Sequence, residues 1–222
     1  MKYYFTCLLF MISTIIFCQN IDEKRDLLIQ NLCNILSKNK NLDDLARINL
    51  VNQDANLIKY FKDLPKDKIE AEEEALFYRF QKNCKEYADL IKNYSEKNTE
   101  NWVSINYLPQ STINESDFKL IKKSSEFYYF DYEGNKTIVK IENNNWIEYF
   151  IDESFSKLKL HWLNNNDFNL EFIESNNSMK KSFSRKGEIY QYRILSKEND
   201  YYWVVYYNND LSNIVKFKFY IQ

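Results

Sequence analysis

The sequence is poor in the residues that most catalytic motifs need. Its 222 residues include one histidine, two glycines and two prolines. A catalytic triad, a zinc site with histidine ligands or histidine acid/base chemistry would have to use His161. His161 alternates with Leu160 and Trp162 and shares a strand face with Lys157 and Lys159, which predicts an exposed side chain. No catalytic, metal-binding or phosphate-binding motif stands out, so we expect a protein that is not an enzyme and needs neither cofactor nor metal.

An excess of one charge is also lacking. Lys and Arg number 30, Asp and Glu number 32, and the formal net charge is −2. The charges are spread along both halves of the chain, so we expect no nucleic-acid partner. The basic residues Lys180, Lys181, Arg185 and Lys186 are interpreted as a solvated turn. The acidic run from Glu70 to Glu74 is interpreted as a solvated helix start.

Long hydrophobic runs are missing except at the beginning of the chain. Lys2 precedes an apolar stretch from Phe5 to Phe17, which is typical of a secretory signal peptide over residues 1–19. The stretch is shorter than the ~20 residues that span a membrane. We therefore predict export to the periplasm or the outside. Lipidation at Cys18 is the alternative, and only then would the protein be bound to a membrane.

Two of the four cysteines fall in this signal, which leaves Cys33 and Cys84. An even pair in a chain bound for an oxidising compartment predicts a disulfide. Two unpaired thiols are the alternative, because spacing alone does not show that the β-carbons meet.

The composition changes near residue 100, after which all four tryptophans fall. Apolar residues at helical spacing predict a helical region over residues 20–100. We expect one helix at 22–38. A second segment, capped by Asn41 and broken near Asn52, would end at Pro65. The third helix is expected to be the longest and to continue to about Tyr94.

Residues 101–222 show the period of two that is typical of half-buried strands. Strands are expected near 127–132, 137–142, 146–151, 157–162, 168–172, 190–194, 201–207 and 215–221. Asparagine-rich turns separate them, and Asn tolerates the left-handed region that glycine usually supplies. The predicted fold class is α+β: a small N-terminal helical bundle followed by an antiparallel, barrel-like β-meander with no helix between its strands.

The C-terminal part resembles a group of exported bacterial proteins. The segments Ser156-Lys157-Leu158-Lys159-Leu160-His161-Trp162, Asp167-Phe168-Asn169-Leu170-Glu171-Phe172, Gly187 to Tyr192 and Phe217-Lys218-Phe219-Tyr220 carry the resemblance to proteins with a calycin-like (lipocalin-like) β-meander. The Gly-x-Trp opening of true lipocalins is absent, since Glu100 and Asn101 precede Trp102. The resemblance implies a barrel that holds an apolar or amphipathic ligand, and it implies no reaction.

Aromatic residues are abundant on the segment from 201 to 207, where rings occur at both odd and even positions. One set must point away from the core. We predict that Tyr201, Trp203 and Tyr207 bind a small ligand or an envelope protein. The alternative is that these rings pack the barrel's outside against the helical region.

Carboxylates offer a competing function, because a hydrolase acting on glycans needs only two of them. Glu171 and Glu174 are three residues apart, which places them on opposite faces of a regular strand. Glu171 and Glu188 are therefore the residues to test for catalysis. Asn164, Asn165, Asn166 and Asp167 superficially suggest calcium but lack the EF-hand glycine, and are interpreted as a hairpin turn. A structural role in the cell envelope is a third hypothesis.

Overall fold

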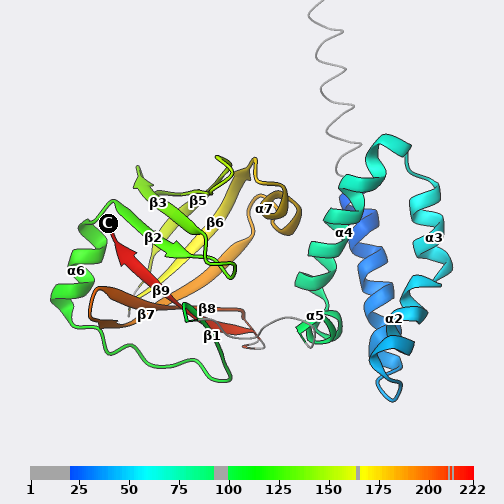
Figure 1. The fold of residues 1–222 in the computed structure, drawn as a ribbon, viewed down its shortest axis with the longest axis horizontal. Coiled ribbons are helices and arrows are strands. Elements are labelled where there is room, and N and C mark those ends of the chain that lie inside the picture. Colours follow the sequence, from blue (N-terminus) through cyan, green and yellow to red (C-terminus); the bar gives the residue numbers. More distant parts are fainter. Residues whose placement is uncertain (1–20, 93–99, 164–165, 210, 212) are drawn as a thin grey trace, which may run out of the picture. The chain divides into compact units, whose positions relative to one another are not determined.

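The structure, a computed structural model, describes residues 21–92, 100–163, 166–209, 211 and 213–222. The chain divides into two compact units, residues 1–94 and residues 95–222 (Figure 1). The predicted signal peptide and Cys18 lie outside the described residues. Within the described part of the chain, no helix combines the length and apolar character needed to cross a membrane.

The first unit is a small bundle of helices. Its elements are a helix at 21–38, α2 (Asp44–Asn52), α3 (Ala55–Lys62), the 3-10 turn η1 (Lys66–Lys68), α4 (Ile69–Asn83) and α5 (Lys85–Lys92). The predicted break near Asn52 is confirmed, because Asp54 caps α3 by accepting hydrogen bonds from the amides of Asn56 and Leu57. The cap of α2 is Asp43 rather than the expected Asn41. The core contains Leu28, Ile29, Leu32, Leu36, Val51, Leu76, Phe80, Cys84 and Leu90.

The predicted third helix is not continuous. Cys84 is extended, with φ −131° and ψ 105°, and separates α4 from α5. The helix at 21–38 is therefore longer than either piece. The sulfur atoms of Cys33 and Cys84 lie at bonding distance and the Cα atoms are 5.6 Å apart, as expected for a disulfide. The bond joins the first helix to the point where α4 ends.

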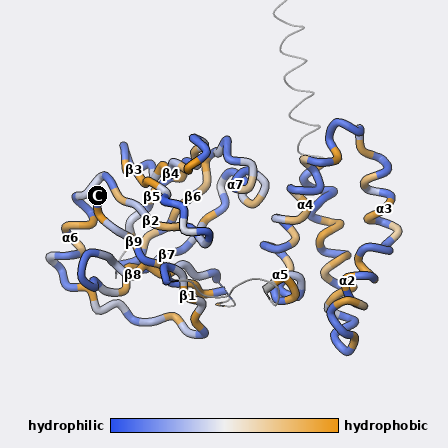
Figure 2. The backbone as a smooth tube through the Cα atoms, viewed as in Figure 1, coloured by the Kyte–Doolittle hydropathy of each residue, from blue (hydrophilic) through white to orange (hydrophobic). Residues whose placement is uncertain are grey.

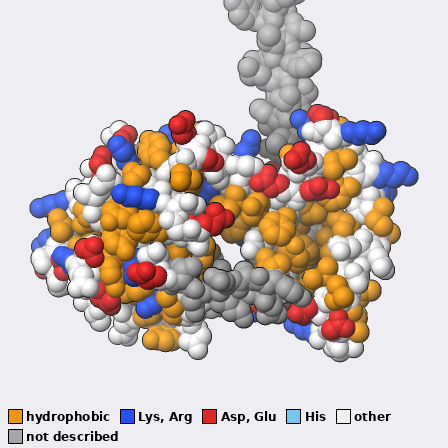
Figure 3. All heavy atoms as spheres, in the orientation of Figure 1, with side chains coloured by type: hydrophobic (Ala, Val, Ile, Leu, Met, Phe, Trp, Pro, Cys, Tyr) orange, Lys and Arg blue, Asp and Glu red, His pale blue; other side chains and the backbone are white. Residues whose placement is uncertain are grey.

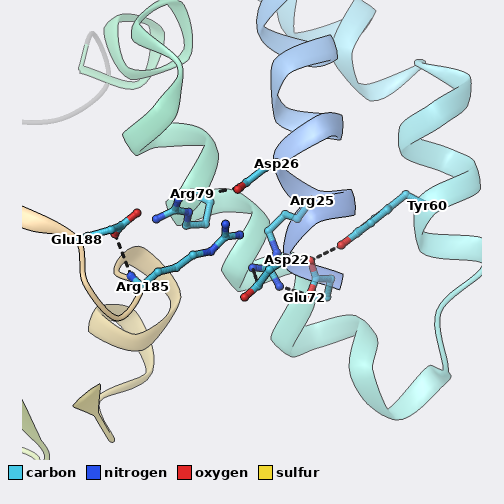
Figure 4. A network of polar contacts seen from close by, with 8 residues as sticks. All are labelled: Asp22, Arg25, Asp26, Tyr60, Glu72, Arg79, Arg185 and Glu188. Atoms are coloured by element: carbon cyan, nitrogen blue, oxygen red, sulfur yellow. Dashed lines mark hydrogen bonds and ion pairs between the residues drawn. The ribbon is translucent and has the colours of Figure 1, made fainter. Parts of the chain in front are cut away.

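The interpretation of residues 70–74 as a solvated helix start is wrong for Glu72. Its side chain is buried and accepts hydrogen bonds from Arg25 and from the Tyr60 hydroxyl (Figure 4). Glu70 and Glu73 are exposed. Helical periodicity explains the difference, because one position of an acidic run faces inward, where only a paired charge is tolerated.

The second unit is a closed antiparallel barrel. Its strands are β1 (Trp102–Ile105), β2 (Glu126–Phe130), β3 (Lys136–Glu142), β4 (Asn145–Tyr149), β5 (Phe155–Trp162), β6 (Asp167–Ser175), β7 (Ile189–Glu198), β8 (Tyr201–Tyr207) and β9 (Ile214–Ile221). Strands β2 to β8 follow one another, and β9 pairs with both β8 and β2. Eight strands thus close the barrel, and β1 adds to the first half of β9. The α+β class and the barrel are confirmed.

Hydrophobic and hydrophilic residues alternate along these strands (Figure 2). Strand β5 shows the pattern clearly. Leu158 and Leu160 are buried, whereas His161 is exposed. On the face of the molecule in view, acidic and basic side chains are interspersed among hydrophobic ones (Figure 3). The period of two therefore separates a barrel interior from an outer surface of mixed charge.

The expectation of no helix between the strands is wrong. Helix α6 (Glu115–Lys123) lies between β1 and β2, and α7 (Ser178–Phe183) lies between β6 and β7. Asn114 caps α6 and Asn177 caps α7 with side-chain hydrogen bonds to backbone amides. Both caps belong to asparagine-containing segments that also fit the composition of a turn, because Asn serves both purposes.

Asparagine replaces glycine at some of the hairpins, whereas Gly134, with φ 85°, serves the turn between β2 and β3. Asn143 and Asn144 have φ values of 51° and 60° and form the two-residue connection between β3 and β4. This is the backbone sign that tight hairpin turns require. In the predicted turn from 164 to 167, Asn164 and Asn165 lie outside the described residues. Asn166 has φ 68°, and β5 and β6 pair antiparallel on either side, as the hairpin interpretation expects. The Asp167 carboxylate is bound by Arg193 and not arranged as part of a calcium loop.

The prediction that Glu171 and Glu174 face opposite sides of the sheet is wrong. Glu174 lies opposite Lys157, whereas Glu171 lies opposite Lys159, with a register shift between Lys157 and Leu158. Since Lys157 and Lys159 share one face, both glutamates share it too. A β-bulge with one extra residue in β6 restores the common face.

Candidate functional site at the tyrosine end of the barrel

Aromatic side chains occupy the barrel interior. Stacked pairs link both neighbouring and more distant strands. Ring centroids are 4.8 Å apart for Phe127 and Phe219, on the paired strands β2 and β9, and 5.2 Å apart for Trp146 on β4 and Phe219. Phe168 stacks on Tyr192 at 5.1 Å. These contacts extend the interior core over strands from every part of the barrel. Side chains of the protein therefore fill the central part of the barrel.

Helix α6 covers one end of the interior. Its Ile121 is buried in the barrel core, and Phe118 packs edge-on against Trp162 at 5.8 Å. Lys197 on β7 also binds Asp117 of this helix at 3.1 Å. This end is apolar and is covered by the protein's own helix.

The opposite end is rich in hydroxyl groups, and we call it the tyrosine end. It contains the inward-facing Tyr129 of β2, Tyr190 and Tyr192 of β7 and Tyr206 of β8, together with Glu148 of β4. Glu148 follows the buried Trp146 by two residues, so both side chains face inward. The strand period thus brings a carboxylate into an aromatic interior.

The Glu148 carboxylate has two different sides. Its Oε1 accepts hydrogen bonds from the Tyr129 hydroxyl at 3.1 Å and from Nε1 of Trp146 at 3.3 Å. Its Oε2 faces the ammonium of Lys180 on α7 at 3.9 Å, which is an ion pair but too long for a hydrogen bond. The Glu148 side chain is 12% exposed. The carboxylate is therefore held firmly on one oxygen and loosely on the other.

Two phenols of this end, those of Tyr129 and Tyr192, have raised pKa values. Burial raises the pKa of Tyr129 well above its ordinary value, and the negative charge of Glu148 raises it further. The same two causes, in the same order, raise the pKa of Tyr192. The Tyr129 hydroxyl therefore keeps the proton that it donates to the Glu148 carboxylate.

A series of aromatic rings in contact extends from the barrel interior toward solvent. Trp102 stacks on Phe217 at 4.7 Å and on Tyr132 at 4.8 Å, and it lies 6.0 Å from Tyr129. Tyr132 is 52% exposed. This arrangement gives the tyrosine end an aromatic edge that is accessible from outside.

The outer face of β8 carries the three residues predicted from sequence to bind a ligand, Tyr201, Trp203 and Tyr207. Trp203 belongs to a second apolar cluster with Leu195, Val205 and Ile214, against which Tyr201 and Tyr207 pack. Tyr201 lies edge-on to Trp203 at 5.5 Å. The structure groups these three rings on the outside and does not bring them together with Glu148, and their role in binding stays a prediction.

The two candidate catalytic carboxylates differ in position: Glu171 lies on the outer face of the barrel, and Glu188 is bound to the backbone. Glu171 contacts His161 at 3.2 Å on the outer face, where both side chains are more than 40% exposed. The exposed position predicted for His161 is confirmed. Glu188 accepts a hydrogen bond from the amide of Arg185 at 2.9 Å.

Sequence reasoning missed Glu148. The alternation of the strand could have indicated it, since Glu148 lies two residues after Trp146 and therefore on the same, inward face. The interpretation of Lys180 as part of a solvated turn is wrong, because Lys180 lies on α7 and its ammonium approaches Glu148.

Metal-ligating side chains meet at one place among the described residues, where Cys33, Cys84 and Glu86 cluster. The two sulfur atoms lie at bonding distance from each other, which removes the thiolates that a metal would need. This cluster is the disulfide of the helical unit and not a metal centre.

Fold and site together define a closed eight-stranded antiparallel barrel with a carboxylate set among aromatic rings at one end. Comparisons with protein-family models, with curated proteins and with solved structures find no match to this chain.

Proposed function

We propose that this chain is an exported, non-enzymatic protein whose barrel binds a small amphipathic ligand at the tyrosine end. The observation that carries the proposal is Glu148, a carboxylate that is mostly buried among aromatic rings and has one loosely engaged oxygen. Ligand sites of small molecules combine an apolar lining with a few polar groups that fix orientation. The rings of the tyrosine end would contact the ligand's apolar part, and Glu148 would bind its polar part.

Two further observations support this proposal. The resemblance to calycin-like proteins implies a ligand held by the barrel, and the closed eight-stranded barrel is compatible with it. The Cys33–Cys84 pair at bonding distance agrees with an oxidising compartment outside the cytoplasm.

A glycan hydrolase remains the competing hypothesis. Glycosidases place two carboxyl groups on either side of the scissile bond. Glu171 is engaged with His161 and Glu188 with a backbone amide. Turnover of a glycan that is lost in Glu171→Gln or Glu188→Gln, without loss of fold, would favour the enzyme.

The test of ligand binding is native mass spectrometry of the protein purified from its own host. We expect a retained adduct of small mass. Tyr192→Ala, at the tyrosine end, should lose the adduct, whereas Tyr107→Ala, an exposed tyrosine of the same unit, should keep it. An adduct-free monomer that shows no thermal shift with panels of lipids and glycans would contradict the proposal.

A further inference from the structure

We propose that the ligand carries a positively charged amino group, which binds Oε2 of Glu148 at the position that the ammonium of Lys180 now approaches. This inference rests on the proposed function and names the chemical class of its ligand.

The first argument is the unequal use of the two carboxylate oxygens. Tyr129 and Trp146 both donate to Oε1, whereas the Lys180 ammonium stays 3.9 Å from Oε2. A charge-assisted hydrogen bond from an amine would be about 2.7–2.9 Å long. An incoming amine can therefore make a shorter contact with Oε2 than the protein's own lysine makes.

The second argument is the surroundings of the carboxylate. A carboxylate that is 12% exposed has lost much of its hydration, and a cation at contact distance compensates that loss. The faces of aromatic rings also attract cations. An anionic ligand would be repelled by Glu148, and a neutral ligand would gain only a weaker hydrogen bond.

The third argument is that Lys180 can leave. It belongs to a six-residue helix, its side chain is 30% exposed, and its ammonium lies 5.5 Å from the centre of the Phe150 ring. A lysine stem can turn its ammonium into solvent without losing a buried hydrogen bond. Lys180 thus holds the charge of Glu148 in balance until an amine replaces it.

The other charged groups near this end do not offer the same site. Glu188 lies 3.5 Å from the Tyr190 hydroxyl, but the same carboxylate oxygen already accepts the amide of Arg185. Asp152 is held by the amide of Ser154. Glu148 is therefore the carboxylate whose inward direction and loose partner fit an amine.

The experiment uses the mature chain with its disulfide intact and measures binding by isothermal titration calorimetry and tryptophan fluorescence. The probes are 2-phenylethylamine and dodecylamine, each paired with the alcohol of the same carbon skeleton. We expect each amine to bind at least tenfold more tightly than its alcohol at low salt. Because Trp146 donates to Glu148, its fluorescence should change when an amine binds.

Two variants with matched controls locate the site. Glu148→Gln should remove the preference for amines, whereas Glu174→Gln should retain it, since Glu174 lies 3.9 Å from Lys157 on the outer face. Lys180→Met should strengthen amine binding several-fold by removing the competing ammonium. Lys181→Met, an exposed neighbour on the same helix, should leave the affinity unchanged.

Three results would overturn the inference. Alcohols that bind as tightly as amines would refute the charge, and an unchanged affinity in Lys180→Met would refute the displacement even if Glu148→Gln fails to fold. If no probe binds, the amine class is refuted. A retained adduct from the native host would still support the proposed function in each case, so the two proposals fail separately.

Discussion

The guanidinium of Arg25 and the carboxylate of Glu72 form a bidentate ion pair between the helix at 21–38 and α4. Both side chains are less than a tenth exposed. The Tyr60 hydroxyl donates a third hydrogen bond to this carboxylate at 2.6 Å (Figure 4). Removing one partner of a buried pair leaves the remaining charge poorly compensated, and Arg25 would keep only its contact with Asp22 at 2.7 Å. We expect Glu72→Gln to destabilise the helical unit by about 3 kcal/mol in urea unfolding followed by circular dichroism at 222 nm. Glu73→Gln, which is exposed, should change stability by less than about 0.5 kcal/mol.

Reduction of the Cys33–Cys84 bond should affect the helical unit alone. The bond closes a loop with a sequence separation of 51, and the chain-entropy model gives it about 4 kcal/mol. All four tryptophans and no cysteine lie in residues 101–222. With dithiothreitol, the unfolding midpoint from circular dichroism should fall while that from tryptophan fluorescence stays constant. A double variant, Cys33→Ser with Cys84→Ser, should not respond to the reductant, and equal shifts of both midpoints would show that the units unfold together.

Alkaline pH should unfold the barrel through its buried tyrosines. The pKa values of Tyr129 and Tyr192 are raised in the folded state, so the folded chain keeps protons that the unfolded chain releases above about pH 10. Below that pH the two tyrosines make their full contribution to the free energy of unfolding. As pH rises through the folded pKa this contribution is lost, by about 1.4 kcal/mol for each tyrosine and each pH unit. Tyrosinate absorbance at 295 nm should therefore show a late step that coincides with unfolding.

Tyr192→Phe should reduce this pH dependence, whereas Tyr107→Phe, an exposed tyrosine of the same unit, should not. A late step that is unchanged in Tyr192→Phe would show that other tyrosines cause it.

The connection between β3 and β4 should be sensitive to β-branched residues. Asn144 has φ 60°, a conformation that is strained for a side chain branched at Cβ. We expect Asn144→Val to lower the free energy of unfolding of the barrel by about 1–2 kcal/mol. Asn144→Gly is the matched control and should be tolerated, because glycine adopts positive φ readily. Equal effects of the two substitutions would contradict a left-handed turn at this position.

Much of the fold could be predicted from particular residues. The alternation of Leu158, Leu160 and Trp162 with charged neighbours predicts which face of β5 is buried. The observed burial of β5 follows this alternation. The break near Asn52 also follows from local capping chemistry. Local signals of this kind depend on neighbours in the sequence, which are known before folding.

Helices α6 and α7 show where such signals become ambiguous. The segment from Asn114 to Asp117 carries a helix cap, and Phe118 and Ile121 lie at helical spacing, yet the segment is short and lies among strands. An asparagine followed by polar residues fits a cap and a turn equally well. Packing of Phe118 and Ile121 against the barrel end is what favours the helix.

The bulge in β6 shows a different limit. A period of two places Glu171 and Glu174 on opposite faces, and one extra residue brings them back to the same face. Sequence periodicity assumes a regular ladder, and the position of a bulge depends on the partner strand.

The sequence by itself determined the helical region, the alternating strands and the asparagine turns, since these depend on period and backbone preference. It predicted the Cys33–Cys84 pair from residue count, and the structure places the two sulfur atoms at bonding distance. Only the tertiary structure decided that Glu148 on β4 accepts a hydrogen bond from Tyr129 on β2, and that its charge raises the pKa of Tyr192 on β7. Alternation tells which face of a strand a residue occupies, but not which residues share one level of a barrel. That level depends on register, bulges and closure between strands distant in the sequence.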